Sequence, residues 1–296
     1  MHDMAELTPE ILTHEQAHRQ LRDAFRAAAL ATPELDARVL LAAATRLDDT
    51  QLALQAEAPI DAAAHAQLLT WQAQRIQGAP VSRLIGQRGF YGRTFKINRH
   101  VLDPRPDSEL LVETVLAARA ASQSPQRVLD LGTGSGCLII SLLAEAGPWS
   151  GVGLDASRQA LAMARANAHR LGVRDRLHLR HSHWFDAVTK SDGLFDVIIS
   201  NPPYIRRADI AALDIEVRAH DPLMALDGGV DGLRDYRLIT QAAAAYLKAG
   251  GGLYFEIGHD QADAVGTMMQ KAGFVGLQVR QDLAGRDRLV SGQKKV

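Results

Sequence analysis

Four residues after an apolar segment have the composition of a clamp for a planar nitrogen. Asn201, Pro202, Pro203 and Tyr204 follow the run at 195–200. Each proline fixes its φ at about −65° and disfavours helical geometry in the residue before it, so Asn201 and Pro202 should both be extended. The Asn201 side-chain oxygen and the Pro202 carbonyl could then accept from one –NH2 group, with Tyr204 as a flat surface beside it. This chemistry suits group transfer to an amino or amide nitrogen, although the tetrapeptide could also be a proline-rich turn that closes a strand.

A second motif, Asp-Leu-Gly-Thr-Gly-Ser-Gly at 130–136, joins a predicted strand to a predicted helix. Its glycines permit a tight turn and close approach of a ligand, and the helix N-terminus adds partial positive charge. A dinucleotide-binding loop that began at Gly132 would need glycine or alanine where this chain has Cys137. The spacing instead resembles the loop of Rossmann-like S-adenosylmethionine-dependent methyltransferases, which passes beneath the methionine part of the cofactor. Asp155, at the end of the next predicted strand, could accept both ribose hydroxyls.

Alternating strands and helices should position these motifs. Strands are predicted at 128–131, 151–155, 177–181, 195–200 and 253–257, with two more near 275–280 and 288–292. Helices are predicted from about residue 137, at 157–171, at 231–248 and at 261–272. Repeated strand–helix units indicate a mostly parallel sheet covered on both faces, with ligands beyond the carboxyl ends of its strands. Both motifs lie at such ends.

The chain before this region differs in composition. Residues 1–86 are rich in Ala, Leu and Gln with helical periodicity, which predicts a small helical domain. One helix should begin at Thr32 and Pro33, and a second near Asp61. The first of these helices should bury Leu35, Val39, Leu40, Ala43 and Leu47. Alternation around Gly92 predicts a β-hairpin, so residues 87–104 are expected to link the helical domain to a catalytic domain at 105–296.

Composition narrows the classes of function. With 47% hydrophobic residues in 296, the chain can bury a large core. The 33 basic and 34 acidic residues give a net charge of −1, which gives no reason to expect nucleic-acid binding driven by bulk charge. Cys137 is the only cysteine, so an intrachain disulfide is excluded and a reducing compartment fits. The N-terminus lacks the pattern of a signal peptide and no apolar run could span a membrane, so we expect a soluble, cytoplasmic protein.

Three further segments narrow the resemblance, because Asn-Pro-Pro-Tyr occurs both in methyltransferases of the adenine amine and in those of protein glutamine. The segments at 104–113, 181–185 and 221–233 together resemble the peptide chain release factor glutamine methyltransferase family, HemK/PrmC. That family has a small helical N-terminal domain joined by a β-hairpin to a Rossmann-like class I methyltransferase domain, so the resemblance covers nearly the whole chain. A related family methylates a glutamine of a large-subunit ribosomal protein, but the sequences at 105–109 and 285–288 favour the release-factor branch.

The resemblance implies a reaction and a set of site residues. The methyl donor would be S-adenosyl-L-methionine, which leaves as S-adenosyl-L-homocysteine, and no metal would take part. The acceptor would be the glutamine of a Gly-Gly-Gln loop in release factors. The enzyme would be a monomer that binds neither nucleic acid nor membrane directly. The implied cofactor-binding residues are Gly132, Thr133, Gly134, Ser135, Gly136, Asp155, Trp184, Phe185 and Asn201. The implied substrate-binding residues are Asn201, Pro202, Pro203 and Tyr204, of which Asn201, Pro202 and Tyr204 would be catalytic.

Some residues depart from the family pattern or have two interpretations. His183 stands where many relatives have Asp, which puts a carboxylate contact to the adenine amine in doubt, and Asp103 replaces an apolar residue. Glu256 could shape the substrate site or serve only the fold. Arg105 and Glu109 could pair at a helix start or border the site. A nucleic-acid amine methyltransferase and a non-catalytic binding module are the alternative functions, and near-zero charge and the intact motifs count against them.

Overall fold

The structure is a computed structural model that describes residues 12–122 and 124–296. These residues form two compact units, divided between Ile85 and Gly86. Our expectation that the N-terminus is not a signal peptide concerns residues 1–11, which lie outside the described residues. In the part of the chain that is described, no helix combines the length and the apolar character needed to cross a membrane.

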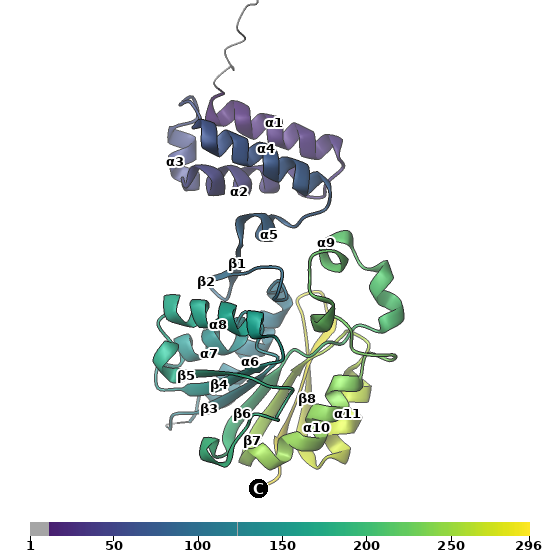
Figure 1. Ribbon diagram of the computed structural model, residues 1–296. Helices are drawn as coiled ribbons and strands as arrows, with labels where there is room; N and C mark the ends of the chain where they lie inside the picture. The colour runs from purple at the N-terminus through teal and green to yellow at the C-terminus, as the bar shows by residue number, and fades with distance from the viewer. Residues whose placement is uncertain (1–11, 123) are drawn as a thin grey trace, which may run out of the picture. The chain divides into compact units, whose positions relative to one another are not determined.

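The first unit is helical (Figure 1). Its helices are α1 (His14–Ala27), α2 (Pro33–Thr45), α3 (Asp49–Leu54), α4 (Ala62–Ile76) and α5 (Val81–Ile85). Polar residues begin them: the Thr13 side chain caps α1 together with Gln16, and Asp61 accepts from two backbone N–H groups at the start of α4. The apolar core of this unit contains Leu21, Phe25 and Leu40.

The buried face of α2 differs from the predicted one. Leu40 is buried as predicted, but Leu35 is 48% exposed and Ala37 and Leu41 are buried instead. The reason is a polar residue: Asp36 accepts from Arg75 Nε of α4 at 2.7 Å, and both side chains are buried. Because a buried carboxylate must be paired, this contact turns the Asp36 side of α2 inward.

The second unit contains the predicted sheet (Figure 1). Its strands are β3 (Arg127–Leu131), β4 (Ser150–Asp155), β5 (Leu177–His181), β6 (Phe195–Ser200), β7 (Leu247–Glu256), β8 (Phe274–Gln281) and β9 (Asp287–Lys294). The order is β5-β4-β3-β6-β7-β9-β8, and only the β9 pairings are antiparallel. The mostly parallel sheet is confirmed.

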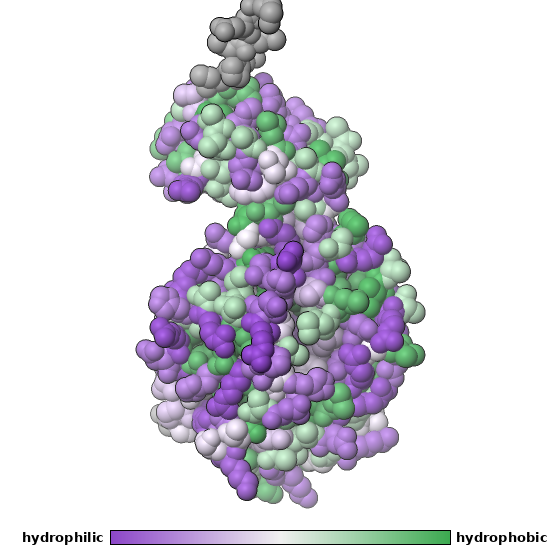
Figure 2. All heavy atoms as spheres, in the orientation of Figure 1, coloured by the Kyte–Doolittle hydropathy of each residue, from purple (hydrophilic) through white to green (hydrophobic). Residues whose placement is uncertain are grey.

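Helices cover both faces of this sheet. They are α6 (Glu109–Arg119), α7 (Cys137–Glu145), α8 (Arg158–Arg170), α10 (Arg234–Tyr246) and α11 (Ala262–Lys271), whereas the short helix α9 (Ile215–Arg218) belongs to the segment between β6 and α10 (Figure 1). Neighbouring strand residues alternate between two cores: Val197 and Ile199 pack with α6 and α7, whereas Ile198 packs with α10 and α11. Burial of both faces explains why the central strand β6 is apolar at successive positions from Val197 to Ile199. On the face of the second unit that Figure 2 shows, hydrophilic residues predominate.

The predicted hairpin consists of β1 (Gln87–Phe90) and β2 (Arg93–Lys96). Tyr91 and Gly92 at its turn have φ of 48° and 68°, as a two-residue hairpin of right-handed twist requires. Glu109 Oε1 accepts from the Tyr91 backbone N–H at 2.8 Å, and Phe90 is buried in the core on the α6 side of the sheet. The contacts of the hairpin therefore place it within the second unit.

Candidate active site

The carboxyl ends of four parallel strands meet at one edge of the sheet. Leu131 of β3 pairs with Leu154 of β4 and with Ser200 of β6, and Ser200 pairs with Phe255 of β7. This register places the loop at 132–136 beside Asp155, Asn201 and Glu256. The two motifs that the sequence separates by more than sixty residues thus lie together.

The glycine loop is held by hydrogen bonds from its own backbone. The N–H groups of Gly132 and Thr133 both donate to the Leu154 carbonyl at 2.9 Å. Gly132, Gly134 and Gly136 have φ of 76°, 56° and 82°, in a region of backbone conformation that residues other than glycine rarely adopt. A Cβ on Gly136 would also lie 2.6 Å from Ile140 Cδ1. The loop therefore exposes bare backbone at the edge of the sheet, as close approach of a ligand requires.

Asp155 is fixed by two backbone amides. Its Oδ2 accepts from Gly134 N at 2.8 Å and its Oδ1 from Ser157 N at 2.7 Å. Burial raises the pKa of this carboxyl, and the two backbone hydrogen bonds oppose the rise. Each carboxylate oxygen can accept two hydrogen bonds, so both oxygens can still accept from a pair of neighbouring hydroxyls.

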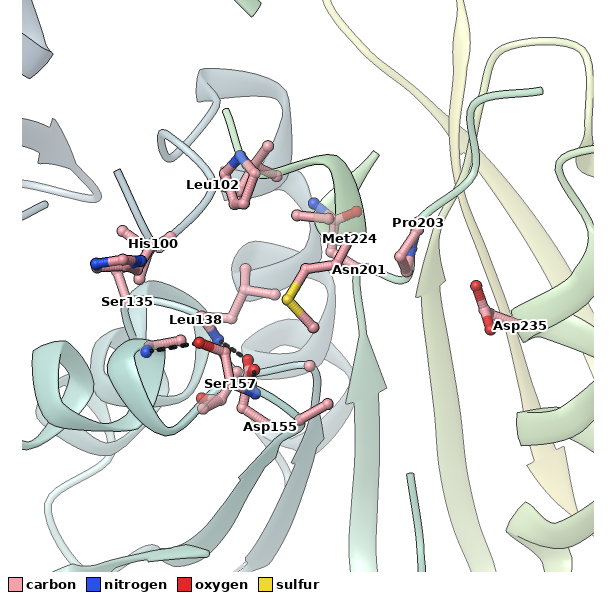
Figure 3. A pocket seen from close by; sticks show the side chains of 18 of the residues that line it. His100, Leu102, Ser135, Leu138, Asp155, Ser157, Asn201, Pro203, Met224 and Asp235 are labelled. Atoms are coloured by element: carbon pink, nitrogen blue, oxygen red, sulfur yellow. Dashed lines mark hydrogen bonds between the residues drawn. The ribbon is translucent and has the colours of Figure 1, made fainter. Parts of the chain in front are cut away.

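A cavity of about 620 Å³ opens between these strand ends (Figure 3). Figure 3 shows Met224 reaching into it between the β4 end with Asp155 and the β6 end with Asn201. The predicted site residues that line it are Gly132, Thr133, Gly134, Ser135, Asp155, Trp184, Asn201 and Pro203. Gly136, Pro202, Tyr204 and Phe185 lie outside its lining.

Trp184 and Phe185 have different surroundings although they are adjacent. Trp184 lines the cavity, and its Cζ3 lies 3.7 Å from where a Cβ on Gly132 would be. Its φ of 44° is unusual for a bulky residue, and such backbone strain is concentrated at functional sites. Phe185 instead is buried and stacks on Tyr246 with ring centroids 4.5 Å apart. The structure thus places Phe185 in the core beside the site.

The Asn-Pro-Pro-Tyr corner borders two cavities. Asn201 lines the first and also a second one of about 460 Å³, which Tyr204 lines as well. The two cavities share Leu102, Arg105 and Ala225 in addition to Asn201. Asn201 therefore stands at the junction between a space lined by the glycine loop and a space lined by an aromatic ring.

Arg105 and Glu109 have separate tasks. Arg105 lines both cavities, and its Nη2 donates to Asp221 Oδ2 at 2.6 Å. Asp221 also accepts from the Asp103 backbone N–H at 3.1 Å, which ties the segment before α6 to the segment between β6 and α10. Glu109 accepts from the hairpin turn. Arg105 therefore borders the two cavities and does not pair with Glu109 at the start of a helix.

Several lining residues were absent from the sequence prediction. They are His100, Val101, Leu102, Ser108, Leu138, Ser157, Ala160, Arg234 and Asp235. Their residue types are common on any surface, and only their place beside strand ends makes them part of the cavity. Asn167 was also missed: its side chain bonds the Ser135 carbonyl of the loop and both backbone groups of Lys96 in the hairpin.

Two buried carboxyls lie at strand ends. Burial raises the pKa of Asp130, at the end of β3, and of Glu256, at the end of β7, each to about 7. Burial also raises the pKa of the Cys137 thiol to about 12, so this cysteine is a packed neutral residue at neutral pH. Within residues 12–122 and 124–296, no three His, Cys, Asp or Glu side chains are grouped as a metal ion would require.

Two glycines allow the backbone of the corner to be enclosed. A Cβ on Gly228 would lie 2.6 Å from the Pro203 carbonyl oxygen, and one on Gly232 would lie 2.4 Å from the Tyr204 carbonyl oxygen. Gln261 Nε2 donates to that Tyr204 oxygen at 3.0 Å and to the Gly232 oxygen at 3.2 Å. Close contact of glycine backbone and the buried Gln261 amide thus fixes the corner from outside the first cavity.

Gly232→Ala should therefore destabilise the protein and distort the corner. The methyl group meets a backbone oxygen, and φ of 74° disfavours alanine, so we expect the free energy of unfolding to fall by about 2 kcal/mol. Denaturant unfolding measures this change. The matched control is Gly266→Ala in α11, where a Cβ meets no atom within 4 Å and alanine should stabilise the helix by about 0.5–1 kcal/mol. Equal effects of the two substitutions would contradict the proposed close contact.

Comparison with known proteins places both units in known families. The family model "Methyltransferase small domain" matches residues 101–218, and the model "PrmC N-terminal domain" matches residues 16–86. A methyltransferase structure from Pyrococcus furiosus aligns with 77% of this chain and 99% of its own at a TM-score of 0.50 and 15% identity. At that identity the likeness concerns the fold alone, and it agrees with the predicted Rossmann-like methyltransferase fold.

Two relatives match most of the chain in sequence. A release factor glutamine methyltransferase from Agrobacterium fabrum is 41% identical over 273 residues, which are 91% of this chain and 93% of the relative. A protein of the same description from Cereibacter sphaeroides is 45% identical over 258 residues, which are 87% of this chain and 90% of the relative. Both alignments span the helical unit and the sheet unit.

Proposed function

Because this chain belongs to the family of release factor glutamine methyltransferases, we propose that its strand-end site methylates the side-chain amide nitrogen of a release-factor glutamine. The methyl donor is S-adenosyl-L-methionine, as in the methyltransferase family that the second unit matches. The observation that carries the proposal is the position of Asn201, where the cavity of the glycine loop meets the cavity lined by Tyr204. A donor and an acceptor that enter from opposite sides would meet at this residue.

The residues of the first cavity fit S-adenosyl-L-methionine. The backbone of Gly132 and Gly134 would carry its methionine end, because left-handed glycines leave the chain without side chains there. The fixed Asp155 carboxylate would accept from the ribose hydroxyls, and Trp184 would border the adenine. When bound, the cofactor supplies an electrophilic methyl group on a positively charged sulfur.

The task of the Asn-Pro-Pro-Tyr corner is to make an amide nitrogen nucleophilic. An amide lone pair is delocalised into its carbonyl, so the nitrogen reacts poorly unless that conjugation is weakened. In our proposal Asn201 Oδ1 and the Pro202 carbonyl oxygen each accept a hydrogen bond from one N–H group of the substrate amide. These two hydrogen bonds raise the electron density on the nitrogen and stabilise the positive charge that develops there. Tyr204 and Pro203 bound the amide plane. The methylated nitrogen is strongly acidic, so it can release its extra proton to solvent without a dedicated base.

We extend the proposal to the organisation of the chain. Residues 1–86 would form the domain that recognises the release factor, residues 87–104 would link it, and residues 105–296 would carry the reaction. The proposed enzyme acts as a monomer in the cytoplasm, without a metal, and does not bind nucleic acid directly. The near-zero net charge supports the last point.

Transfer of labelled methyl groups tests the proposal. The protein is incubated with labelled S-adenosyl-L-methionine and, in parallel, with release factor, with ribosomal protein and with DNA. We expect label on the release factor, located by mass spectrometry on one glutamine and lost when that glutamine is replaced by alanine. Label on the ribosomal protein alone would assign the chain to the related glutamine methyltransferases, and label on DNA alone would contradict glutamine transfer.

A further inference from the structure

Glu256 is a buried carboxyl with no task in the reaction described so far. It is the last residue of β7 and only 3% exposed. Since Phe255 pairs with Ser200, Glu256 lies beside Asn201 at the end of the adjacent strand. Its Oε2 is buried and has no hydrogen-bond partner among the described residues. A carboxyl in such surroundings is unfavourable unless something else requires it.

The side chains of Asn201 and of its hydrogen-bond partner Ser108 lie next to Glu256. Asn201 Nδ2 donates to Ser108 Oγ at 3.4 Å, and the side chains of Ser108 and Asn201 both lie close enough to Glu256 to lower the pKa of its carboxyl against the rise caused by burial. A side-chain amide has a donor end and an acceptor end. An acceptor on the protein side binds the NH2 end and leaves the oxygen end for the substrate.

We propose that Glu256 is a positioning residue for methyl transfer: its carboxylate, with the Ser108 hydroxyl, holds the Asn201 NH2 group so that Oδ1 faces the substrate amide. This inference rests on the proposed function of Asn201. A reversed amide would present N–H donors to the substrate –NH2 group, and two donors repel. The carboxylate thus selects one of the two orientations of the Asn201 side-chain amide, which have nearly the same shape.

The charge on Glu256 should govern this orientation. The ionisable groups that act on it or feel its charge are Arg288 of β9, Asp107 before α6, Tyr204, Tyr236 of α10 and Cys137 of α7. Of these, Arg288 favours the carboxylate and Asp107 opposes it, but burial is the largest influence and raises the pKa to about 7. Above that pH the carboxylate only accepts. Below it the protonated carboxyl can donate to Asn201 Oδ1 and compete with the substrate.

Activity and stability should therefore depend on pH in opposite senses. The kcat of the native enzyme should fall as the pH drops below about 7. Stability behaves differently, because the folded protein holds the proton of Glu256 to higher pH than the unfolded chain, whose ordinary value is 4.5. The contribution of Glu256 to stability is hence largest below pH 4.5 and declines as the pH rises to about 7. Glu256→Gln should remove this decline.

A double-mutant cycle tests whether Glu256 acts through Asn201. The proteins are the native enzyme, Glu256→Gln, Asn201→Ala and the double variant, assayed on release factor with S-adenosyl-L-methionine at saturation. We expect Glu256→Gln to lower kcat about tenfold at pH 8, to leave the Kd for S-adenosyl-L-methionine within twofold, and to abolish the fall in kcat near pH 7. In the Asn201→Ala background the same substitution should change kcat less than twofold.

Asp130→Asn is the matched control, since Asp130 is equally buried with a pKa raised to about 7 but lies at the end of β3. In the double variant, the effects of Asp130→Asn and Asn201→Ala on kcat should multiply, as expected for two residues that act independently. A tenfold loss on Glu256→Gln in both backgrounds would overturn the positioning role and indicate a structural one, as would an unchanged pH profile. If the native enzyme does not methylate release factor, the proposed function fails; if only the coupling is absent, the role of Glu256 fails.

Discussion

Asn201→Ala should lower kcat by about 10²-fold or more and leave the binding of S-adenosyl-L-methionine largely intact. Removal of one preorganised hydrogen bond to a transition state has a cost on this scale. The first cavity has many other lining residues, among them Gly132, Asp155 and Trp184, so the affinity for S-adenosyl-L-methionine should change little. Single-turnover kinetics with release factor measure the methyl-transfer rate, and calorimetric titration measures the Kd for the cofactor.

The variant is also expected to fold normally. Asn201 is only half-buried, and its one hydrogen bond from Nδ2, to Ser108, is long at 3.4 Å. Thermal unfolding of the variant should thus resemble that of the native protein and serves as the control. Near-normal turnover in a folded Asn201→Ala enzyme would refute the nitrogen clamp.

Asp155→Ala should weaken the binding of S-adenosyl-L-methionine by about 10²-fold, because it removes charge-assisted hydrogen bonds to two ribose hydroxyls. It also removes the acceptor that holds Gly134 N and Ser157 N, so the loop beneath the cofactor loses its support. The increase should appear in the Kd for the cofactor. At saturating cofactor kcat should fall much less, since Asp155 does not touch the reacting nitrogen in this mechanism.

Asp175→Ala provides a control of the same chemistry. Asp175 lies in the short 3-10 helix Arg174–Arg176, is exposed and lines neither cavity. Loss of a carboxylate there should leave the Kd within twofold. A Kd for Asp155→Ala that is equally unchanged would mean that the ribose does not bind at this strand end.

The strand–helix pattern of the second unit could be predicted because short strands rich in apolar residues, such as 195–200, alternate with longer segments of helical periodicity. The motifs at 130–136 and 201–204 could be found because glycine permits, and proline restricts, backbone conformations through local geometry alone. The start of α4 near Asp61 was predicted from helical periodicity, and the structure shows that Asp61 caps this helix. These features depend on neighbours in sequence.

Features that depend on distant partners were predicted less well. The inward face of α2 is set by Asp36 and Arg75, which are 39 residues apart, so its apolar pattern alone indicated the wrong face. Phe185 stays a predicted neighbour of the adenine, and only the structure shows that its ring stacks on Tyr246 in the core. Glu256 still has two interpretations from the sequence, and its place beside Asn201 could be known only from the pairing of β6 with β7.

By itself the sequence determined the class of sheet, the glycine loop, the strand-end acid and the proline-restrained corner, because these follow from backbone preferences and from apolar periodicity. Only the tertiary structure decided which side chains share a cavity, which aromatic ring is buried and which carboxyl lies behind Asn201. The physical reason is that burial and pairing of polar groups are properties of a place in the fold, and residues far apart in the chain create that place together.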